Sequence, residues 1–339
     1  MKTRKPKNKL SPAEELRRSL PPVTDWNTTD EHEVNRRRLR AMEEPPLSIE
    51  NLDPKHPVFS NFKVYSQSGR EYAVEIRDLE NRVFASDTID FQINGLGTDK
   101  HVEAVLMHLQ KRERKAFREA LENGSGRVDV VPFQNGLKIE RNPRLLPESL
   151  RKFVSPDGSV DQPEAFLDAA KKSRAAKLRI SQEVAPWMES RRREAERMLL
   201  RRDYEAKVVS GEYPAHETKL PLYPYQRDGM LHLAFTGRAL LADEMGLGKT
   251  VQAIAGSELL DRLRTIEKVL VISPASLKSE WQEQIDKFSN RQALIIQGMR
   301  KRRYQLYERP AFYYLANYEQ MLYDKDYINT ELKPDLIIL

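Results

Sequence analysis

Cysteine is absent from all 339 residues of this sequence. The chain can therefore form no disulfide, and it has no thiolate with which to hold a metal. No apolar run approaches the roughly 20 residues that a helix needs to cross a bilayer. The first twenty residues also lack the apolar centre of a secretory signal. We therefore expect a cytoplasmic protein with no membrane partner.

A strong excess of either charge is also missing. Lys and Arg total 57 while Asp and Glu total 51, so the net charge is +6, which permits a polyanionic partner but does not require one. Residues 1–56 combine a basic start with repeated prolines. Such a stretch buries too little apolar surface to offset the entropy lost on ordering. We predict a disordered basic tail over 1–56, either solvated or acting as an arm that contacts nucleic acid.

A small α+β domain is predicted over residues 57–112. Apolar residues at 62–65 and at 72–76 flank a turn, which indicates two strands, and Val83 with Phe84 suggests a third. A short helix follows over 101–110. One face of this helix carries four apolar residues: Val102, Val105, Leu106 and Leu109.

Residues 113–219 are highly charged and predict a mostly helical connector. It contains one strand-like stretch, at 127–133, and its clearest helix spans 183–207. Basic and acidic residues alternate along that helix at spacings that allow i,i+4 pairs. This pattern favours a solvated spacer over a DNA-binding helix.

Short apolar runs alternate with helical patterns from residue 220 to residue 339. Buried strands that alternate with helices are typical of an α/β fold with a parallel sheet. The predicted strands are Arg238–Ala242, Lys268–Ile272, Ala293–Ile296, Phe312–Ala316 and Asp335–Leu339. The predicted helices are Thr250–Leu263, Ser276–Phe288 and Met299–Tyr307.

The strongest chemical signal follows the first of these strands. It is the octapeptide Asp243, Glu244, Met245, Gly246, Leu247, Gly248, Lys249 and Thr250. A strand, a glycine-containing turn and a helix in this order form a phosphate-binding P-loop. Its glycines let backbone N–H groups approach phosphate oxygens, Lys249 neutralises the β- and γ-phosphates, and Thr250 places its hydroxyl on Mg²⁺. We therefore predict ATP and Mg²⁺ as cofactors, although the general pattern has glycine where this chain has Asp243.

Three further stretches accompany the P-loop. They are Leu222–Gly229, which contains Gln226, then Ser273–Leu277, and Ala316–Glu319. With them the sequence resembles the first RecA-like lobe of a Swi/Snf-type ATPase of helicase superfamily two. In that family Asp at the P-loop's first position is usual, so Asp243 fits. A P-loop kinase or GTPase is disfavoured because Gln226 and the Ser273–Leu277 stretch have no role there.

The resemblance implies roles for further residues. The family residue that matches Gln226 recognises adenine, and two segments contact the backbone of double-stranded DNA. The matching DNA-contact candidates here are Pro274, Ala275, Ser276, Leu277, Asn317 and Tyr318. On this resemblance the parent protein is a DNA-dependent ATPase that is helicase-like.

A second resemblance concerns residues 86–109, which are similar to the SWIM zinc module found upstream of bacterial Swi/Snf motors. The module binds zinc through Cys-x-Cys followed by Cys-x-His. The matching positions here are Ser86, Thr88, Asp99 and His101. One imidazole, one carboxylate and two hydroxyls cannot compete with thiolates for Zn²⁺. We expect a degenerate fold that binds no zinc; an unrelated α+β domain with a surface histidine is the alternative.

The final strand is the last feature of the sequence. In the family such a strand leads into the acidic Walker B motif and then a second lobe, which carry the remaining catalytic groups. The resemblance thus implies an incomplete first lobe and a fragment that is inactive alone, arising from a truncated gene, a split coding sequence or a deliberately shortened chain. The alternative is a noncatalytic module that binds nucleic acid or protein.

Overall fold

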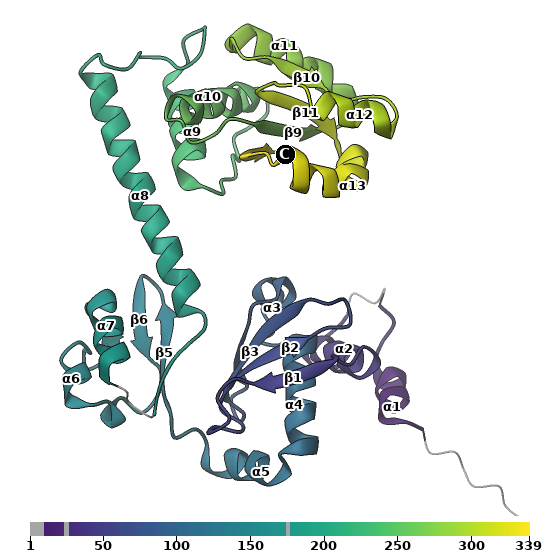
Figure 1. The fold of residues 1–339 in the computed structure, drawn as a ribbon, viewed down its shortest axis with the longest axis vertical. Helices are drawn as coiled ribbons and strands as arrows, with labels where there is room; N and C mark the ends of the chain where they lie inside the picture. Colours follow the sequence, from purple (N-terminus) through teal and green to yellow (C-terminus); the bar gives the residue numbers. More distant parts are fainter. Residues whose placement is uncertain (1–9, 24–26, 174–176) are drawn as a thin grey trace, which may run out of the picture. The chain divides into compact units, whose positions relative to one another are not determined.

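The computed structural model describes residues 10–23, 27–173 and 177–339 (Figure 1). The chain divides into two compact units, Met1–Ser190 and Arg191–Leu339. None of the helices within the described residues is long and apolar enough to cross a membrane.

The first unit opens with helices and an antiparallel sheet whose neighbouring strands follow chain order. These elements are α1 (Pro12–Ser19), α2 (Asp30–Glu43), β1 (Ser48–Asn51), β2 (Asn61–Tyr65), β3 (Glu71–Asp78) and β4 (Val83–Ser86). The helices α3 (Ile89–Asn94), α4 (Lys100–Arg112) and α5 (Arg114–Asn123) follow. We call residues 30–123 the N-terminal domain.

The core of the N-terminal domain lies between its sheet and α4. Phe62 and Val64 alternate with more exposed residues along β2, and they pack in one cluster with the apolar face of α4. All four residues predicted for that face are buried: Val102, Val105, Leu106 and Leu109. Gly69 in the predicted turn has a φ of 77°, a conformation that glycine adopts without steric cost. Strands, turn and helix are therefore confirmed here.

The predicted disorder over residues 1–56 is wrong for much of the described part, where α1, α2 and β1 form. The basic side chains of α2 pair with acids of the domain that follows. Arg38 Nε lies 2.9 Å from Oε2 of Glu103, and Arg37 Nη2 lies 2.8 Å from Oδ1 of Asp90. Glu103 is buried, and a buried carboxylate needs a cationic partner. The prediction of a solvated tail was wrong because the acidic partners of these arginines lie outside residues 1–56. Residues 1–9 and 24–26 lie outside the described residues.

Residues 128–173 and 177–180 form a second small domain where a mostly helical connector was predicted over 113–219. Its sheet has the order β7-β6-β5-β8, and only β8 runs parallel to its neighbour. The elements are β5 (Val128–Phe133), β6 (Gly136–Ile139), α6 (Glu148–Arg151), β7 (Ser159–Val160), α7 (Pro163–Ser173) and β8 (Leu178–Ile180). The predicted strand over 127–133 is confirmed as β5. Strands as short as β7 and β8 leave no alternating pattern to detect.

Buried charges join the two sheets of the first unit. Glu75 on β3 has no exposed surface, and its Oε1 accepts from Arg77 Nε at 2.9 Å. Arg179 on β8 donates to Asp129 Oδ1 at 2.7 Å and to the Ile76 carbonyl at 2.9 Å. Burial alone would raise the pKa of Glu75, but Arg77 and Arg179 outweigh it and lower that pKa. The carboxylate therefore stays charged inside the protein.

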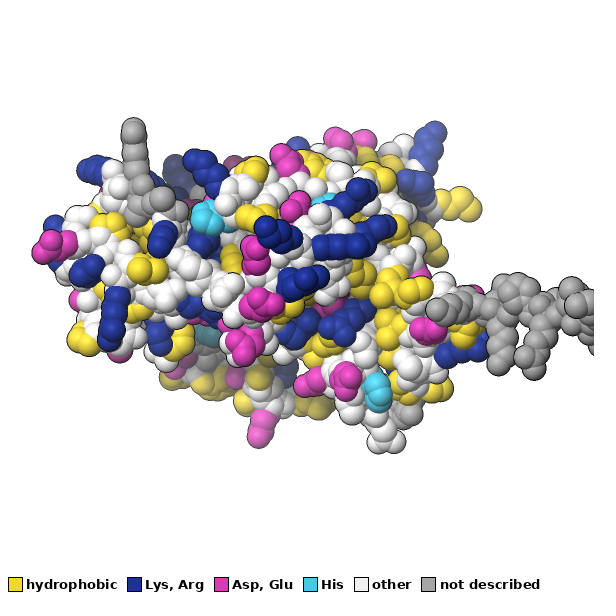
Figure 2. Space-filling model, turned by 90° about the horizontal axis from the view of Figure 1, so that it is seen from below, with side chains coloured by type: hydrophobic (Ala, Val, Ile, Leu, Met, Phe, Trp, Pro, Cys, Tyr) yellow, Lys and Arg dark blue, Asp and Glu magenta, His cyan; other side chains and the backbone are white. Residues whose placement is uncertain are grey.

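A long helix, α8 (Val184–Val209), confirms the helix predicted over 183–207. Ion pairs one turn apart stabilise it, including Arg201 Nε with Glu205 at 3.1 Å and Lys207 Nζ with Asp203 at 3.0 Å. On the face of the molecule in Figure 2, Lys and Arg side chains lie among Asp and Glu, as their similar totals predict.

The second unit contains a fully parallel sheet with the order β10-β11-β9-β12, which confirms the predicted α/β class. Its elements are α9 (Pro224–Thr236), α10 (Lys249–Arg262), β9 (Val269–Ser273), α11 (Lys278–Phe288), β10 (Ala293–Ile295), α12 (Arg300–Tyr307), β11 (Tyr313–Asn317), α13 (Tyr318–Tyr327) and β12 (Leu336–Ile338). A 3-10 turn (Ala275–Leu277) precedes α11, and a π-helical turn (Ile328–Leu332) follows α13.

Both faces of this sheet are buried. Val269 and Val271 of β9 pack in a cluster with Ile254 of α10 and Ile285 of α11. The intervening residues of β9 belong to a second cluster, which holds Leu306 of α12 and residues that follow α13. The central strands β9 and β11 are therefore covered on both faces, and they reach solvent chiefly at their ends. The loops of the sheet are therefore the places where a ligand can bind.

The strand predicted over Arg238–Ala242 is wrong. The segment forms no strand, and 84% of Leu240 is exposed. A strand depends on a hydrogen-bonded neighbour, and within the described residues no strand lies beside this segment. The strand at the other end of the prediction, over 335–339, does form as β12 and pairs with β9.

The buried charges give the first prediction. Glu75→Ala should destabilise the first unit by about 3–5 kcal/mol, because Arg77 and Arg179 lose a buried anionic partner. Amide hydrogen exchange in residues 71–78 and 178–182 should then accelerate by about two orders of magnitude. Glu71→Ala on the same strand is the matched control, since its pair with Lys63 is exposed. Equal exchange in the two variants would contradict this account.

Candidate functional site

The predicted P-loop contains two glycines in the left-handed backbone region, directly before a helix. Gly246 and Gly248 have φ values of 86° and 76°, which other residues rarely adopt. Gly248 is the N-cap of α10 and supplies no side-chain acceptor for the first N–H groups of the helix. Such N–H groups, together with the helix dipole, favour an anion at this position.

Lys249 is the first residue of α10, and its ammonium points back along the loop. Nζ donates to the carbonyl oxygens of Asp243 at 2.8 Å and Glu244 at 2.9 Å. These neutral acceptors leave the charge of the lysine uncompensated, so an anionic oxygen would be a stronger partner. Thr250 follows as the second residue of the helix, and Met245 at the tip of the loop is 96% exposed.

Gln226 lies directly against the P-loop. It is buried on the first turn of α9, and its Oε1 accepts from the N–H of Tyr223 at 3.1 Å. Its Nε2 donates to the carbonyl of Leu247 at 3.3 Å. A side chain on Gly248 would place its Cβ 2.6 Å from Gln226 Nε2, so a larger residue there would displace the Gln226 amide. The structure thus brings Gln226 and the loop together.

A second glutamine, Gln252, was not predicted. It lies on α10 beneath the loop and contacts Asp243 and Leu247. The signal in the sequence was a polar residue between Val251 and Ile254, on a helix face that otherwise packs against the core.

The candidate DNA-contact residues lie at the carboxyl ends of two paired strands. Pro274–Leu277 follow β9 and are exposed, while Asn317 ends β11 and Tyr318 follows it. Ser273 and Asn317 are register partners, so the two loops leave the sheet side by side. Ligands of open α/β sheets bind at this edge.

Lys278 and Gln320 connect these loops to the one after β10 and were also missed. Lys278 Nζ donates to the Ile296 carbonyl at 2.7 Å, and Gln320 Nε2 donates to the same oxygen at 3.1 Å. Gln320 also completes the N-terminal cap of α13 with Asn317. Burial lowers the pKa of Lys278, an effect that Glu319 opposes. Three adjacent loops are therefore fixed relative to one another.

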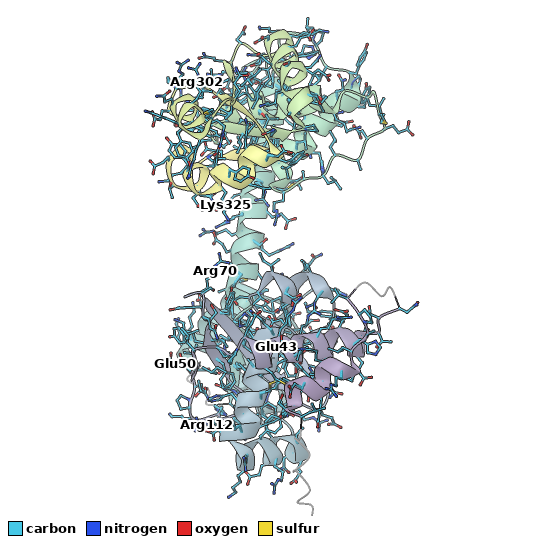
Figure 3. The ribbon with its side chains drawn as sticks, turned by 90° about the vertical axis from the view of Figure 1, so that its right-hand side faces the viewer. Glu43, Glu50, Arg70, Arg112, Arg302 and Lys325 are labelled. Carbon is cyan, nitrogen blue, oxygen red and sulfur yellow. The ribbon has the colours of Figure 1, made fainter. Side chains whose placement is uncertain are left out.

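The loop after β10 leads into a basic helix, α12. Arg300, Lys301 and Arg302 are exposed, and Arg302 lies at the outer surface of the unit (Figure 3). Arg303 instead pairs with buried Asp324, with 2.6 Å between Nη2 and Oδ1. Three cations thus stand next to the loops at the carboxyl edge of the sheet.

The four positions that match zinc ligands also lie close together, in the N-terminal domain. Ser86 Oγ donates to Asp99 Oδ2 at 2.7 Å, and Thr88 Oγ1 donates to the same oxygen. Asp99 Oδ1 caps α4 by accepting from the N–H groups of His101 at 2.8 Å and Val102 at 2.7 Å. Hydrogen bonds through one carboxylate therefore hold β4, α3 and α4 together.

The ring of His101 packs against an aromatic neighbour. It is 7% exposed and stacks on Tyr72 with 4.2 Å between ring centroids. Burial lowers the pKa of His101, which Asp99 partly opposes. Throughout residues 10–23, 27–173 and 177–339, no group of three or more His, Asp or Glu side chains could hold a metal ion.

Comparison with known proteins finds a family match in the C-terminal part of the chain. Residues 181–333 match the family model described as the SNF2-related domain. This part of the chain is thus similar to SNF2 proteins. It contains the P-loop, the glutamines around it and the loops at the carboxyl edge of the sheet.

Individual relatives match over shorter stretches. A Caenorhabditis elegans homolog of the SWI/SNF-related matrix-associated actin-dependent regulator of chromatin subfamily A-like protein 1 is 43% identical over 68 residues, 20% of this chain and 9% of that protein. The human DNA annealing helicase and endonuclease ZRANB3 is 41% identical over 68 residues, 20% of this chain and 6% of that protein. These matches span less than a tenth of the relatives' length.

A solved structure also matches. It is the Sulfolobus solfataricus SWI2/SNF2 ATPase core in complex with double-stranded DNA. The sequence identity is 26% and the TM-score is 0.33, with 37% of this chain and 27% of that chain covered.

The cluster around Asp99 gives the second prediction. Protein purified without chelator should hold far less than one zinc per chain, and added zinc should not raise its melting temperature, because hydroxyls bind Zn²⁺ poorly. Metal analysis measures this. The positive control is Ser86→Cys with Thr88→Cys and Asp99→Cys, which should bind about one zinc with His101. Stoichiometric zinc in the natural chain, lost on His101→Ala, would overturn the prediction.

Proposed function

We propose that residues 220–339 bind ATP with Mg²⁺ and contact double-stranded DNA, as the ATP-binding part of a Swi/Snf-type DNA translocase. One observation carries the nucleotide site: the P-loop between Gly246 and Lys249, with two left-handed glycines, opens a helix that has no side-chain cap. These residues fit a triphosphate. Its γ-phosphate would supply the anionic oxygens that the loop's N–H groups and Lys249 can hold.

The roles follow from position. Lys249 would exchange its carbonyl partners for β- and γ-phosphate oxygens, and Thr250 would offer a hydroxyl to Mg²⁺. Gln226 would hold the adenine while it keeps the corner of the loop at Leu247 in place. The matched SNF2-related domain supports this assignment.

For DNA, we propose the three loops joined by Lys278 and Gln320. Their exposed residues are Pro274, Ala275, Ser276, Leu277 and Tyr318, with Asn317 capping α13. Arg300, Lys301 and Arg302 add positive charge beside them, and contacts to phosphates depend mainly on such charge. These contacts position a backbone and are independent of base sequence.

We further propose that the N-terminal domain is a SWIM-like module without its metal, upstream of a bacterial motor. The convergence of Ser86, Thr88 and Asp99 on one junction supports this, because a C-x-C and C-x-H site would require the same positions to meet. The cysteine variant described above tests the idea, since an unrelated fold has no reason to place four zinc ligands correctly.

The third prediction tests the nucleotide site. The natural chain should bind a fluorescent ATP analogue in the presence of Mg²⁺. Lys249→Ala should weaken binding at least tenfold, since charge-assisted bonds to phosphate disappear. Lys325→Ala, which removes an exposed charge from α13, is the control. If the natural chain binds no nucleotide, a noncatalytic binding module becomes the better account.

The fourth prediction concerns DNA. Lys301→Ala with Arg302→Ala should weaken binding to a short duplex and reduce the slope of log affinity against log salt by about one for each phosphate that is no longer neutralised. The control removes two exposed charges at the opposite edge of the sheet, through Arg264→Ala with Lys287→Ala. Fluorescence anisotropy at several salt concentrations measures both variants. Equal slopes in the two variants would place the DNA elsewhere.

A further inference from the structure

Gln252 is a polar side chain in an otherwise apolar environment. It lies on the first turns of α10 and has no exposed surface. Val251 and Ile254 beside it pack in the interior, as buried residues of a helix usually do. A buried amide is retained where its hydrogen bonds matter, because an apolar side chain of similar size avoids the cost of desolvation.

The contacts of Gln252 are directed at the P-loop. Its Nε2 donates to Asp243 Oδ2 at 2.9 Å and lies 3.4 Å from the Leu247 carbonyl. A carboxylate only accepts hydrogen bonds, so the nitrogen of the amide must face Asp243. The two contacts join Asp243, the first residue of the loop, to Leu247 near the end of the loop. Gln226 donates to the same Leu247 carbonyl from the other helix.

Within the described part of the chain, the oxygen of the Gln252 amide has no partner and lies close to a glycine. Gln252 Oε1 is buried and has no hydrogen-bond partner among the described residues. It lies against Gly229 of α9, where a Cβ would be 1.7 Å from Oε1 and 2.8 Å from Cδ. A larger residue at 229 would therefore displace the amide from this position. The contact with the loop therefore goes together with two costs: α9 has no side chain at position 229, and Gln252 Oε1 has no hydrogen-bond partner in the part of the chain that the structure describes.

We propose that Gln252 is a positioning residue for the P-loop, and that Gly229 is the space that lets it act. The inference rests on the proposed nucleotide site. Lys249 also holds the loop, through the carbonyls of Asp243 and Glu244, but it must leave them to reach a phosphate. The contacts of Gln252 remain when the lysine moves. Gln252 therefore sets the shape of the loop in the nucleotide-bound state.

Gln252→Leu separates positioning from stability. Leucine keeps most of the volume and removes the unpaired oxygen, so the melting temperature should not fall. Affinity for the ATP analogue should fall about tenfold, and amide exchange in residues 243–248 should accelerate even without nucleotide. Gln305→Leu on α12, where the glutamine is exposed, is the matched control and should change none of these.

Two rescues test the geometry. Gln252→Glu alone sets two carboxylates together and should weaken nucleotide binding. Adding Asp243→Asn restores one donor and one acceptor with their roles exchanged, so the double variant should recover much of the missing affinity. Gly229→Ala should act like Gln252→Leu, whereas Gly229→Ala with Gln252→Ala should bind no more weakly than Gln252→Ala alone.

Each result decides between the proposals. If the natural chain binds nucleotide and Gln252→Leu binds it equally well, the positioning role is wrong and the nucleotide site stands. If the natural chain binds none, the nucleotide site is wrong. The exchange measurement then decides on Gln252 alone, and unchanged exchange in residues 243–248 overturns its role. If Gln252→Leu lowers the melting temperature as well as the affinity for the ATP analogue, Gln252 is merely a structural residue.

Discussion

Two glutamine side chains on different helices donate to one carbonyl oxygen, that of Leu247. The candidate nucleotide site depends on this convergence. It fixes the P-loop to α9 and α10 together, and the packing of those helices is in turn fixed by their shared core around Met230 and Ala255. A loop with two left-handed glycines has little preference of its own, so its conformation must come from such contacts.

The same logic holds at the carboxyl edge of the parallel sheet. Loops after buried strands lie at the surface and carry few apolar contacts. Here the carbonyl of Ile296 accepts from Lys278 and Gln320, which belong to the elements after β9 and β11. The Ile296 carbonyl oxygen thus holds together the loops that follow three strands. Both candidate sites use amide and ammonium groups of helices to hold loops that the sheet itself cannot hold.

The sequence was most informative where structure is local. The glycines, the lysine and the helix after them follow from spacing alone, and so do the strands β9 to β12. It failed where a distant partner decides. Arg238–Ala242 is apolar enough for a strand but lacks a neighbour, and α2 looked solvated because Glu103 lies 65 positions away from Arg38 along the chain. Gln252 was missed because its role appears only once Gly229 is beside it.

Ser86 and Thr88 donate to Asp99 at positions where the SWIM-like module that we propose would otherwise carry thiolates. Thiolates are oxidised, and they bind competing metals, so a zinc junction depends on the redox state and the metal supply of its surroundings. Hydroxyl and carboxylate groups undergo neither change. The junction of β4, α3 and α4 should therefore persist under oxidising conditions and when metal ions are scarce, conditions that would weaken a zinc site built from thiolates.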